Sequence, residues 1–180
     1  MYIIIMTTTN RLPTDYKMPE STGSNYLKIT EEPQEFRILT SPIIGWEYFR
    51  ADGDKVTPVR QKEEFDNIPA DSKDESKPKE FRAFPIWNHT LGKVQIAEIT
   101  QASIKKEILK YVQDAENRWD PKTYDFRISR SWKGKETRYT LTALPKSKFE
   151  SEADEKWAFE LAKPINLEAL FSGDDPFKPF

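Results

Sequence analysis

The sequence of 180 residues contains no cysteine and a single histidine, His89. The absence of cysteine excludes disulfides, thiolate zinc sites and cysteine nucleophiles. With one histidine, no site can be built on paired histidines, and a Ser-His-Asp triad is a poor fit. We therefore expect no cofactor, no metal and no catalytic residue.

Long hydrophobic runs are also missing. The apolar start, residues 1–6, is too short to cross a membrane or to form the core of a signal peptide. We expect a cytoplasmic protein (in the host cytoplasm if the protein is viral) without a membrane partner. Glycine is scarce, with six residues, whereas thirteen prolines divide the chain into short segments and loops.

Charge is distributed unevenly along the chain. Residues 1–149 carry 25 Lys and Arg against 22 Asp and Glu, whereas residues 150–180 carry 3 against 8. The length suits one domain with appendages. We predict an N-terminal arm over residues 1–35, one domain over 36–149, and an acidic C-terminal tail over 150–180 whose end, residues 172–180, is extended or disordered.

Hydrophobic periodicity predicts a mainly β domain with one clear helix. Residues 101–115 have helical spacing, and their lysines are expected on a solvated face; residues 151–162 favour a further short helix. The long charged stretch 51–79 is expected to be a loop. Strands are predicted over 36–50 (bent near Pro42 and Gly45), 80–88, 93–99, 124–130 and 137–144. This order predicts a five-stranded OB-fold barrel with its helix between strands three and four.

Aromatic and cationic side chains alternate on these strands. A protein that binds single strands without sequence preference needs cations for the phosphates and flat rings on which bases stack. The pattern favours non-catalytic binding of single-stranded DNA. The candidate binding residues are Trp46, Tyr48, Arg50, Arg82, Phe84, Trp87, Arg127, Arg130, Trp132, Lys133 and Arg138. The alternative is that Trp46, Phe84 and Trp87 belong to the core, and that Arg127 and Arg138 lie on solvated faces paired with acids.

The C-terminal tail combines acids with aromatic rings. Asp174, Asp175, Phe177 and Phe180 are candidates for recruiting partner proteins. Such a tail can also occupy a basic groove of its own domain when DNA is absent. The alternative is a disordered end that only improves solubility.

The segments Phe36–Phe49, Trp87–Ile104 and Tyr124–Tyr139 resemble bacteriophage-type single-stranded-DNA-binding proteins. The stretch Gly173–Phe177 is similar to the acidic, Phe-ending tips of bacterial and phage binding proteins, although Lys178–Phe180 follow it here. The resemblance implies an OB fold that acts in DNA replication, recombination and repair. It also implies a tail that recruits replication and repair proteins.

Two other functions remain open from the sequence. One is an OB-like protein-interaction or virion module that binds no nucleic acid. The other is a metal-dependent nuclease, for which Asp114, Glu116, Asp120 and Asp125 lie close in sequence but match no metal-binding motif; we expect them to be solvated acids. For the oligomeric state we expect a monomer or a weak dimer.

Overall fold

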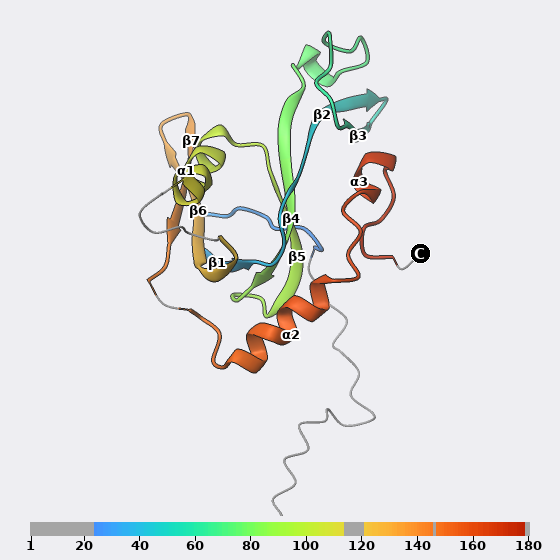
Figure 1. The fold of residues 1–180 in the computed structure, drawn as a ribbon. Helices are drawn as coiled ribbons and strands as arrows, with labels where there is room; N and C mark the ends of the chain where they lie inside the picture. Colours follow the sequence, from blue (N-terminus) through green and yellow to red (C-terminus); the bar gives the residue numbers. More distant parts are fainter. Residues whose placement is uncertain (1–23, 114–120, 146, 179–180) are drawn as a thin grey trace, which may run out of the picture.

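The computed structural model describes residues 24–113, 121–145 and 147–178. The protein is mainly β, as predicted, with one antiparallel seven-stranded sheet and a few helices (Figure 1). The strands are β1 (Gln34–Ile38), β2 (Ile43–Asp52), β3 (Lys55–Gln61), β4 (Lys79–Asn88), β5 (Lys93–Ile99), β6 (Asp125–Lys133) and β7 (Glu136–Ala143). The helices are α1 (Ala102–Gln113), α2 (Glu152–Ala162) and α3 (Ala169–Ser172), with short 3-10 turns η1 (Lys73–Glu75) and η2 (Pro121–Thr123).

The sheet is organised around β4. The strand order is β3-β2-β4-β1-β6-β7, and β5 pairs with the other edge of β4. Strands β1 and β2 follow each other along one edge of β4, because Ile38 pairs with Ile86 and Ile43 pairs with Ala83. The four residues 39–42 therefore face only two residues of β4, which makes a bulge. The predicted single strand with a bend near Pro42 is confirmed in this form.

Strand β3 was not expected, since its residues fall in the stretch predicted to be a loop. It forms a hairpin with β2 through seven paired positions, with Gly53 in the turn at a φ of 59°. Pro58 is tolerated there because β3 is an edge strand that pairs only with β2. We call this β2–β3 hairpin the arm.

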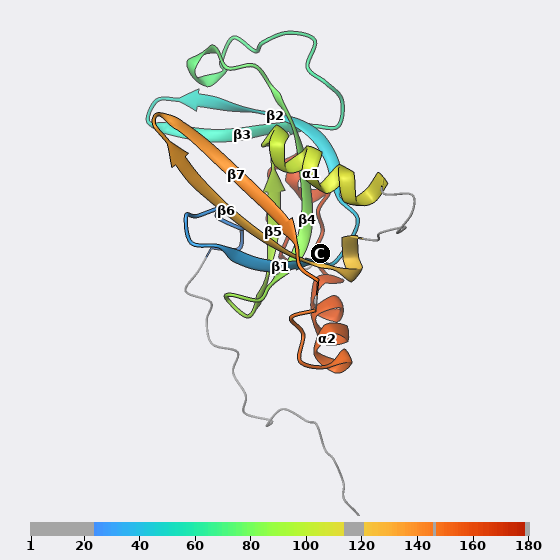
Figure 2. The ribbon, with the colours of Figure 1, turned by 90° about the vertical axis from the view of Figure 1, so that its left-hand side faces the viewer.

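The main core lies between the sheet and α1. It gathers buried side chains from β1, β4, β5, α1, β6 and β7: Phe36, Ile38, Phe84, Ile86, Ala97, Ile99, Ile104, Ile108, Phe126, Ile128 and Leu141. On α1 the predicted periodicity is confirmed, because Ile104 and Ile108 are its buried residues. We call the β6–β7 hairpin the finger. In Figure 2 the turns of the arm and the finger point to the same side of the molecule.

Residues 24–35 of the predicted N-terminal arm lie against the sheet. Tyr26 forms a parallel bridge with Ile96 of β5, and the Leu27 N–H donates to the Ile96 carbonyl over 2.8 Å. Further along, the Arg130 N–H donates to the Thr30 carbonyl over 2.8 Å. This stretch therefore crosses from β5 to β6 and packs on the core. Residues 1–23 of the predicted N-terminal segment (residues 1–35) lie outside the described residues.

The short helix predicted over 151–162 is confirmed as α2, whereas the end expected to be extended or disordered contacts the sheet through Phe177. Helix α2 packs Ala158 and Ala162 against Leu39, with Trp87 at the edge of the contact. Leu170 of α3 packs against the outer face of the sheet at Phe81, Ala83 and Ile96, and Phe171 and Phe177 border this cluster. The tail folds because these apolar residues find an apolar face opposite the main core. Phe180 lies outside the described residues.

The closed five-stranded barrel is not confirmed. Among the described residues no ladder joins β5 to β7, so the pairings describe an open sheet. The domain boundaries also shift, since the packed chain includes residues 24–35 and 147–178. No helix in the described part of the chain is long and apolar enough to span a membrane.

Candidate nucleic-acid interface

The predicted residues of the finger divide between its two faces. Opposite residues of an antiparallel pair lie on one face. Arg130 pairs with Tyr139, and Trp132 pairs with Thr137, so these four share the face that continues the core side. The other face carries Arg127, Lys133 and Arg138. The five candidates therefore cannot all touch one strand of DNA in the same way.

Trp132 and Arg130 form the most exposed aromatic–cation pair of the predicted set. Trp132 is 55% exposed, and its Nε1 donates to Glu31 Oε1 over 2.8 Å. The Arg130 Cζ lies 5.7 Å from the centroid of the Trp132 ring. Arg130 Nε is buried without a hydrogen-bond partner, which is a costly state for a charged donor. A ring fixed at its nitrogen and backed by an arginine presents its open face to a ligand.

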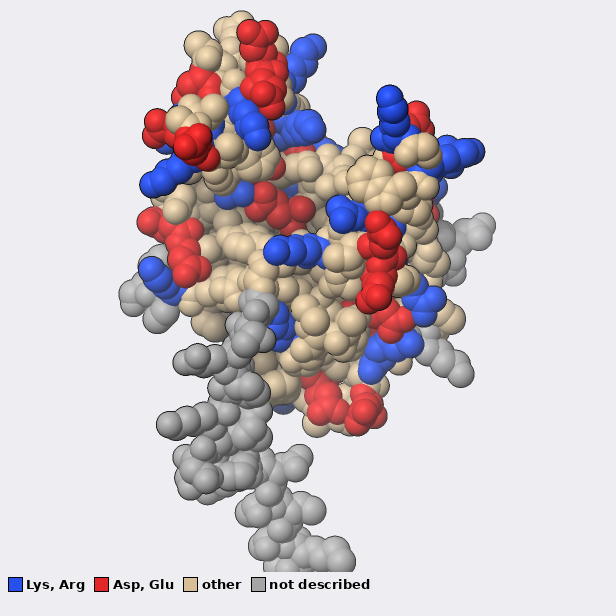
Figure 3. Space-filling view, turned by 180° about the vertical axis from the view of Figure 1, so that it is seen from behind, with Lys and Arg blue, Asp and Glu red and all other residues tan. Residues whose placement is uncertain are grey.

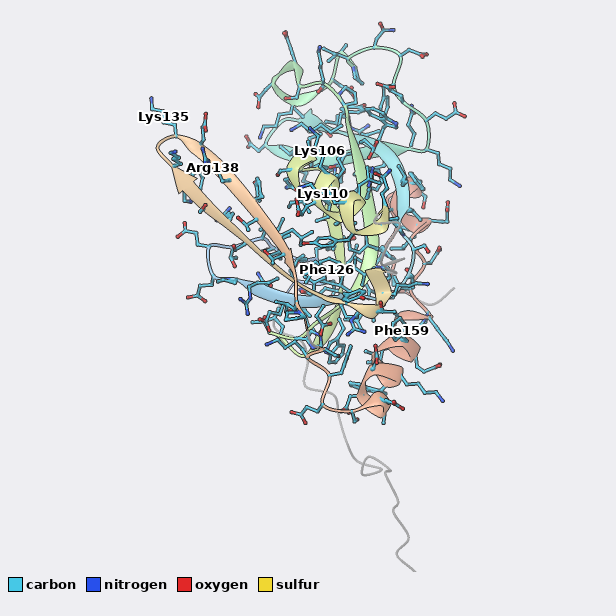
Figure 4. The ribbon with its side chains drawn as sticks, turned by 60° about the vertical axis from the view of Figure 1, so that its left-hand side comes forward. Lys106, Lys110, Phe126, Lys135, Arg138 and Phe159 are labelled. Carbon is cyan, nitrogen blue, oxygen red and sulfur yellow. The ribbon has the colours of Figure 1, made fainter. Side chains whose placement is uncertain are left out.

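Unpaired cations lie on the same hairpin and on the neighbouring helix. Lys133, Lys135 and Arg138 of the finger and Lys106 of α1 make no ion pair with residues that the structure describes. Figure 4 shows Lys135 and Arg138 toward the free end of the finger, and Lys106 and Lys110 on the neighbouring helix. Helix α1 packs against β7, so its lysines belong to the same region. Sequence analysis had assigned these lysines only to a solvated helix face.

Arg127 has a different role. Its guanidinium pairs with Glu35 Oε1 over 2.6 Å, and Lys148 Nζ lies 3.2 Å from Glu35 Oε2. The hydrogen bond from Arg127 lowers the pKa of the Glu35 carboxyl, although partial burial opposes the shift. The alternative of an arginine paired with an acid therefore describes Arg127 correctly.

The predicted residues of the first strand are only partly accessible. Tyr48 is 8% exposed, because its hydroxyl donates to Asp71 Oδ1 over 3.0 Å and its ring stands edge-on to Phe65. Trp46 is half-buried, and Arg50 is exposed. Tyr48 in this conformation cannot stack on a base.

The second predicted strand contributes less than expected. Phe84 is 2% exposed in the main core, so its predicted stacking role is wrong. Arg82 pairs with Glu80 over 3.1 Å. Trp87 points to the opposite, outer face, where it meets Trp157 edge-on at 5.4 Å and lies beside Phe149. It therefore belongs to the contact with α2 and not to the finger side.

A hollow of 380 Å³ lies between the arm and the loop that follows it. Phe49, exposed on β2, lines it together with Lys73, Lys77 and Lys79. Seen from behind, the arm with its loop and the finger form two projections with a saddle between them (Figure 3). These lysines were missed because residues 51–79 were predicted to be a loop; Phe49 lies in the predicted strand 36–50 and was not chosen as a candidate.

Two buried ionic groups hold the fold and face no ligand. Arg37 Nε lies 2.7 Å from Asp125 Oδ1, and His89 Nε2 lies 3.0 Å from the same oxygen; Arg37 also pairs with Glu155. Burial would raise the pKa of the Asp125 carboxyl, but its hydrogen bonds with His89, Arg37 and the Lys148 N–H lower it. The expectation that Asp125 is a solvated acid is wrong.

The other ionic group lies on the outer face of the sheet. Arg60 donates from Nε to Glu47 Oε2 over 3.0 Å and from Nη2 to Glu98 Oε1 over 2.7 Å. Glu47 is 4% exposed. Burial raises the pKa of the Glu47 carboxyl to about 7, and the neighbouring Glu98 carboxylate adds to the rise. One guanidinium thus serves two carboxylates, of which Glu47 titrates near neutral pH.

The candidate tail residues lie at the end of this face. Ser172 Oγ donates to Asp174 Oδ2 over 2.6 Å, and the Phe177 N–H donates to Asp175 Oδ1 over 3.0 Å. Phe177 borders the apolar cluster under α3. In this position its ring is partly covered by its own domain.

A nuclease-type metal site finds no support in the described residues, where no three His, Cys, Asp or Glu side chains converge. Asp114, Glu116 and Asp120 lie outside them, and Asp125 is buried. Comparison of the chain with protein-family models, with curated proteins and with solved structures finds no match.

Proposed function

We propose that this protein binds single-stranded DNA without sequence preference and without chemistry. The observation that carries the proposal is the pair Arg130 and Trp132, an exposed ring backed by a cation with a buried, unpartnered Nε. Lys133, Lys135 and Arg138 lie on the same hairpin, and Lys106 lies on the neighbouring helix α1. A base stacks on the ring while its neighbouring phosphates meet the cations.

The topology is compatible with an OB-related domain. With β1 and β2 counted as one broken strand, the pairings β2–β4, β4–β5, β1–β6 and β6–β7 follow the order expected for such a barrel. Helix α1 lies between the third and fourth of these strands. The arm and the finger are then the two loops that an OB barrel uses for oligonucleotides. We propose that the strand crosses the saddle between them.

The C-terminal segment is proposed to act in two states. In the packed state it covers the outer face of β4 and β5 through Leu170, with Phe177 at the edge. In the released state its acids and Phe177 are free to recruit replication and repair proteins. The small apolar contact of Phe177 makes release easier than unfolding.

A fluorescence titration tests the proposal. A dT oligonucleotide of roughly 12–15 nucleotides covers about one OB-sized site. Binding should quench tryptophan fluorescence and weaken steeply with salt, because bound cations release counterions from the phosphates. No binding at low salt would favour the protein-interaction module instead. Cleavage of the oligonucleotide with magnesium or manganese would favour a nuclease.

Deletion of residues 172–180 tests the tail separately. Binding of the oligonucleotide should remain or become tighter, and capture of replication proteins should be lost. Weaker DNA binding by a deleted protein that still folds would contradict the two-state role of the tail.

A further inference from the structure

A groove with apolar walls lies between α1 and the bulge that joins β1 to β2. Its volume is 290 Å³, and its apolar lining includes Ile38, Phe84, Ile108, Leu109 and Val112. Val112 is 50% exposed, and Leu109 is also exposed. The apolar stripe of α1 is thus wider than the core that covers it, which leaves apolar surface in water.

The described charges at and beside the groove are mostly basic. Arg82 and Lys122 line it, and Arg82 pairs with Glu80. Helix α1 carries three lysines and one glutamate; Lys105 pairs with Glu80 and Lys110 with Glu107, which leaves Lys106 without an ion pair among the described residues. A partner for this groove should therefore combine an apolar side chain with acids.

Helix α2 of the same chain has this combination. Its Trp157 is 46% exposed and is held edge-on against Trp87, so the indole is fixed before any contact forms. The helix carries four acids and one lysine. Glu152 and Asp154 are exposed and make no ion pair with described residues.

We infer that α2 of one copy docks beside α1 of a second copy, with Trp157 in the apolar groove and the acids of α2 facing the lysines of α1. Figures 1 and 2 both show α1 and α2 apart from each other, with α2 at the lower end of the domain and α1 beside β6 and β7. The contact therefore joins two different surfaces, and each added copy leaves one groove and one α2 free. Such a head-to-tail contact extends into an open chain unless the rotation between copies closes it into a ring.

This contact is small and should be weak in solution. If the proposed function holds, a DNA strand keeps neighbouring copies at a high effective concentration, and the same contact makes binding cooperative. Only this consequence rests on the proposed function. The contact itself does not need DNA.

Sedimentation velocity without DNA, up to roughly 300 µM for a weak contact, tests the inference. The wild-type protein should form species larger than dimers as concentration rises. Trp157→Ala removes the indole that enters the groove, and Val112→Asp places a charge in the groove; each should weaken association at least tenfold. In an equal mixture, the Trp157→Ala protein still has an intact groove and the Val112→Asp protein still has Trp157. The mixture should therefore give dimers and nothing larger.

Leu91→Asp is the matched control, because Leu91 is an exposed apolar residue of the β4–β5 turn; it should associate like wild type. Charge reversal of Asp154 to Lys should weaken association, and Lys106→Glu on the other copy should restore it. A monomeric wild type, unaffected single variants, or a mixture without dimers would each overturn the inference. DNA binding by monomers on a short oligonucleotide is measured separately, so failure of one proposal does not decide the other.

Discussion

The Arg130 guanidinium lies over the Trp132 ring, 5.7 Å from its centroid, while the indole nitrogen is tied to Glu31. This relationship orients a ring that would otherwise rotate freely on a solvent-exposed hairpin. An ordered ring loses less entropy when a base stacks on it.

Trp132→Ala should therefore reduce affinity for single strands. Loss of one stacked base corresponds to about 1–3 kcal/mol, or roughly 5- to 150-fold. The loss should be similar for dT, dA and dC oligonucleotides, because every base has a π face. Trp157→Ala is the control on a short oligonucleotide, since this exposed tryptophan lies on α2. Equal losses in both variants would remove the finger from the binding site.

The cations of the finger should show in the salt dependence. Lys135→Ala and Arg138→Ala should each reduce the slope of log K against log salt by about 0.7, the value for one phosphate on a single strand. Arg127→Ala should change the slope less, because Arg127 already pairs with Glu35. The measurement is a titration at four or more salt concentrations. A slope that depends on Arg127 and not on Arg138 would place the strand elsewhere.

Glu47 predicts an unusual dependence of stability on pH. Its pKa is about 7 in the folded protein against the ordinary 4.5, so between these values only the folded state holds the proton. The free energy of unfolding should then fall as pH rises through this window, by the order of 3 kcal/mol. Glu47→Gln should flatten the profile, as measured by urea unfolding from pH 4.5 to 8. An unchanged profile would contradict the assignment.

Asp125 should change the stability with pH in the opposite direction to Glu47. Its pKa is lowered in the folded protein, so its stabilising contribution is present above pH 3.8 and is lost as pH falls through the folded pKa. Asp125→Asn removes the buried charge partner of Arg37 and leaves it only the partly exposed Glu155, which should cost up to about 3–5 kcal/mol. Glu155→Gln should cost less, because Glu155 is partly exposed. Thermal unfolding at pH 7 compares the three proteins.

Gly45 allows α3 to approach the sheet. A Cβ at this position would lie 2.6 Å from the Phe171 Cε1 and 2.7 Å from the Gln61 carbonyl oxygen. Gly45→Ala should therefore displace α3 or the arm and lower stability by about 1–3 kcal/mol. Limited proteolysis after Leu167 should become faster than in the wild type. Gly92→Ala shows the cost of backbone strain without a clash, because Gly92 has a φ of 64° and no neighbour within 4 Å.

The elements with one buried face were predictable. On β6, the buried Phe126 and Ile128 lie on either side of the exposed Arg127, and on α1 the buried residues repeat with helical spacing. Strand β3 has no buried residue, so its sequence carries no alternation to detect. Strand β3 is held by backbone pairing with β2, and this pairing leaves no pattern in the side chains from which it could be predicted.

The site was predicted less well for a related reason. Alternation groups Trp46 with Tyr48, but it does not tell which face a later segment covers. Phe65 and Asp71 cover Tyr48, and α2 covers the face of Trp87. Trp132 was the easier case, because it lies next to the turn of the finger and stays 55% exposed although its Nε1 donates to Glu31.

The residues that cover the outer face of the sheet come later in the sequence than the residues of that face. Phe81, Ala83 and Ile96 are made early, whereas Leu170 and Phe177 are added about 75 to 95 residues later. At roughly 5–20 residues per second, a ribosome leaves this apolar face bare for several seconds. During this time the nascent chain exposes an apolar surface that favours aggregation, until α3 and Phe177 have been synthesised and cover it. Chaperone supply or slow expression should improve the yield of the intact protein.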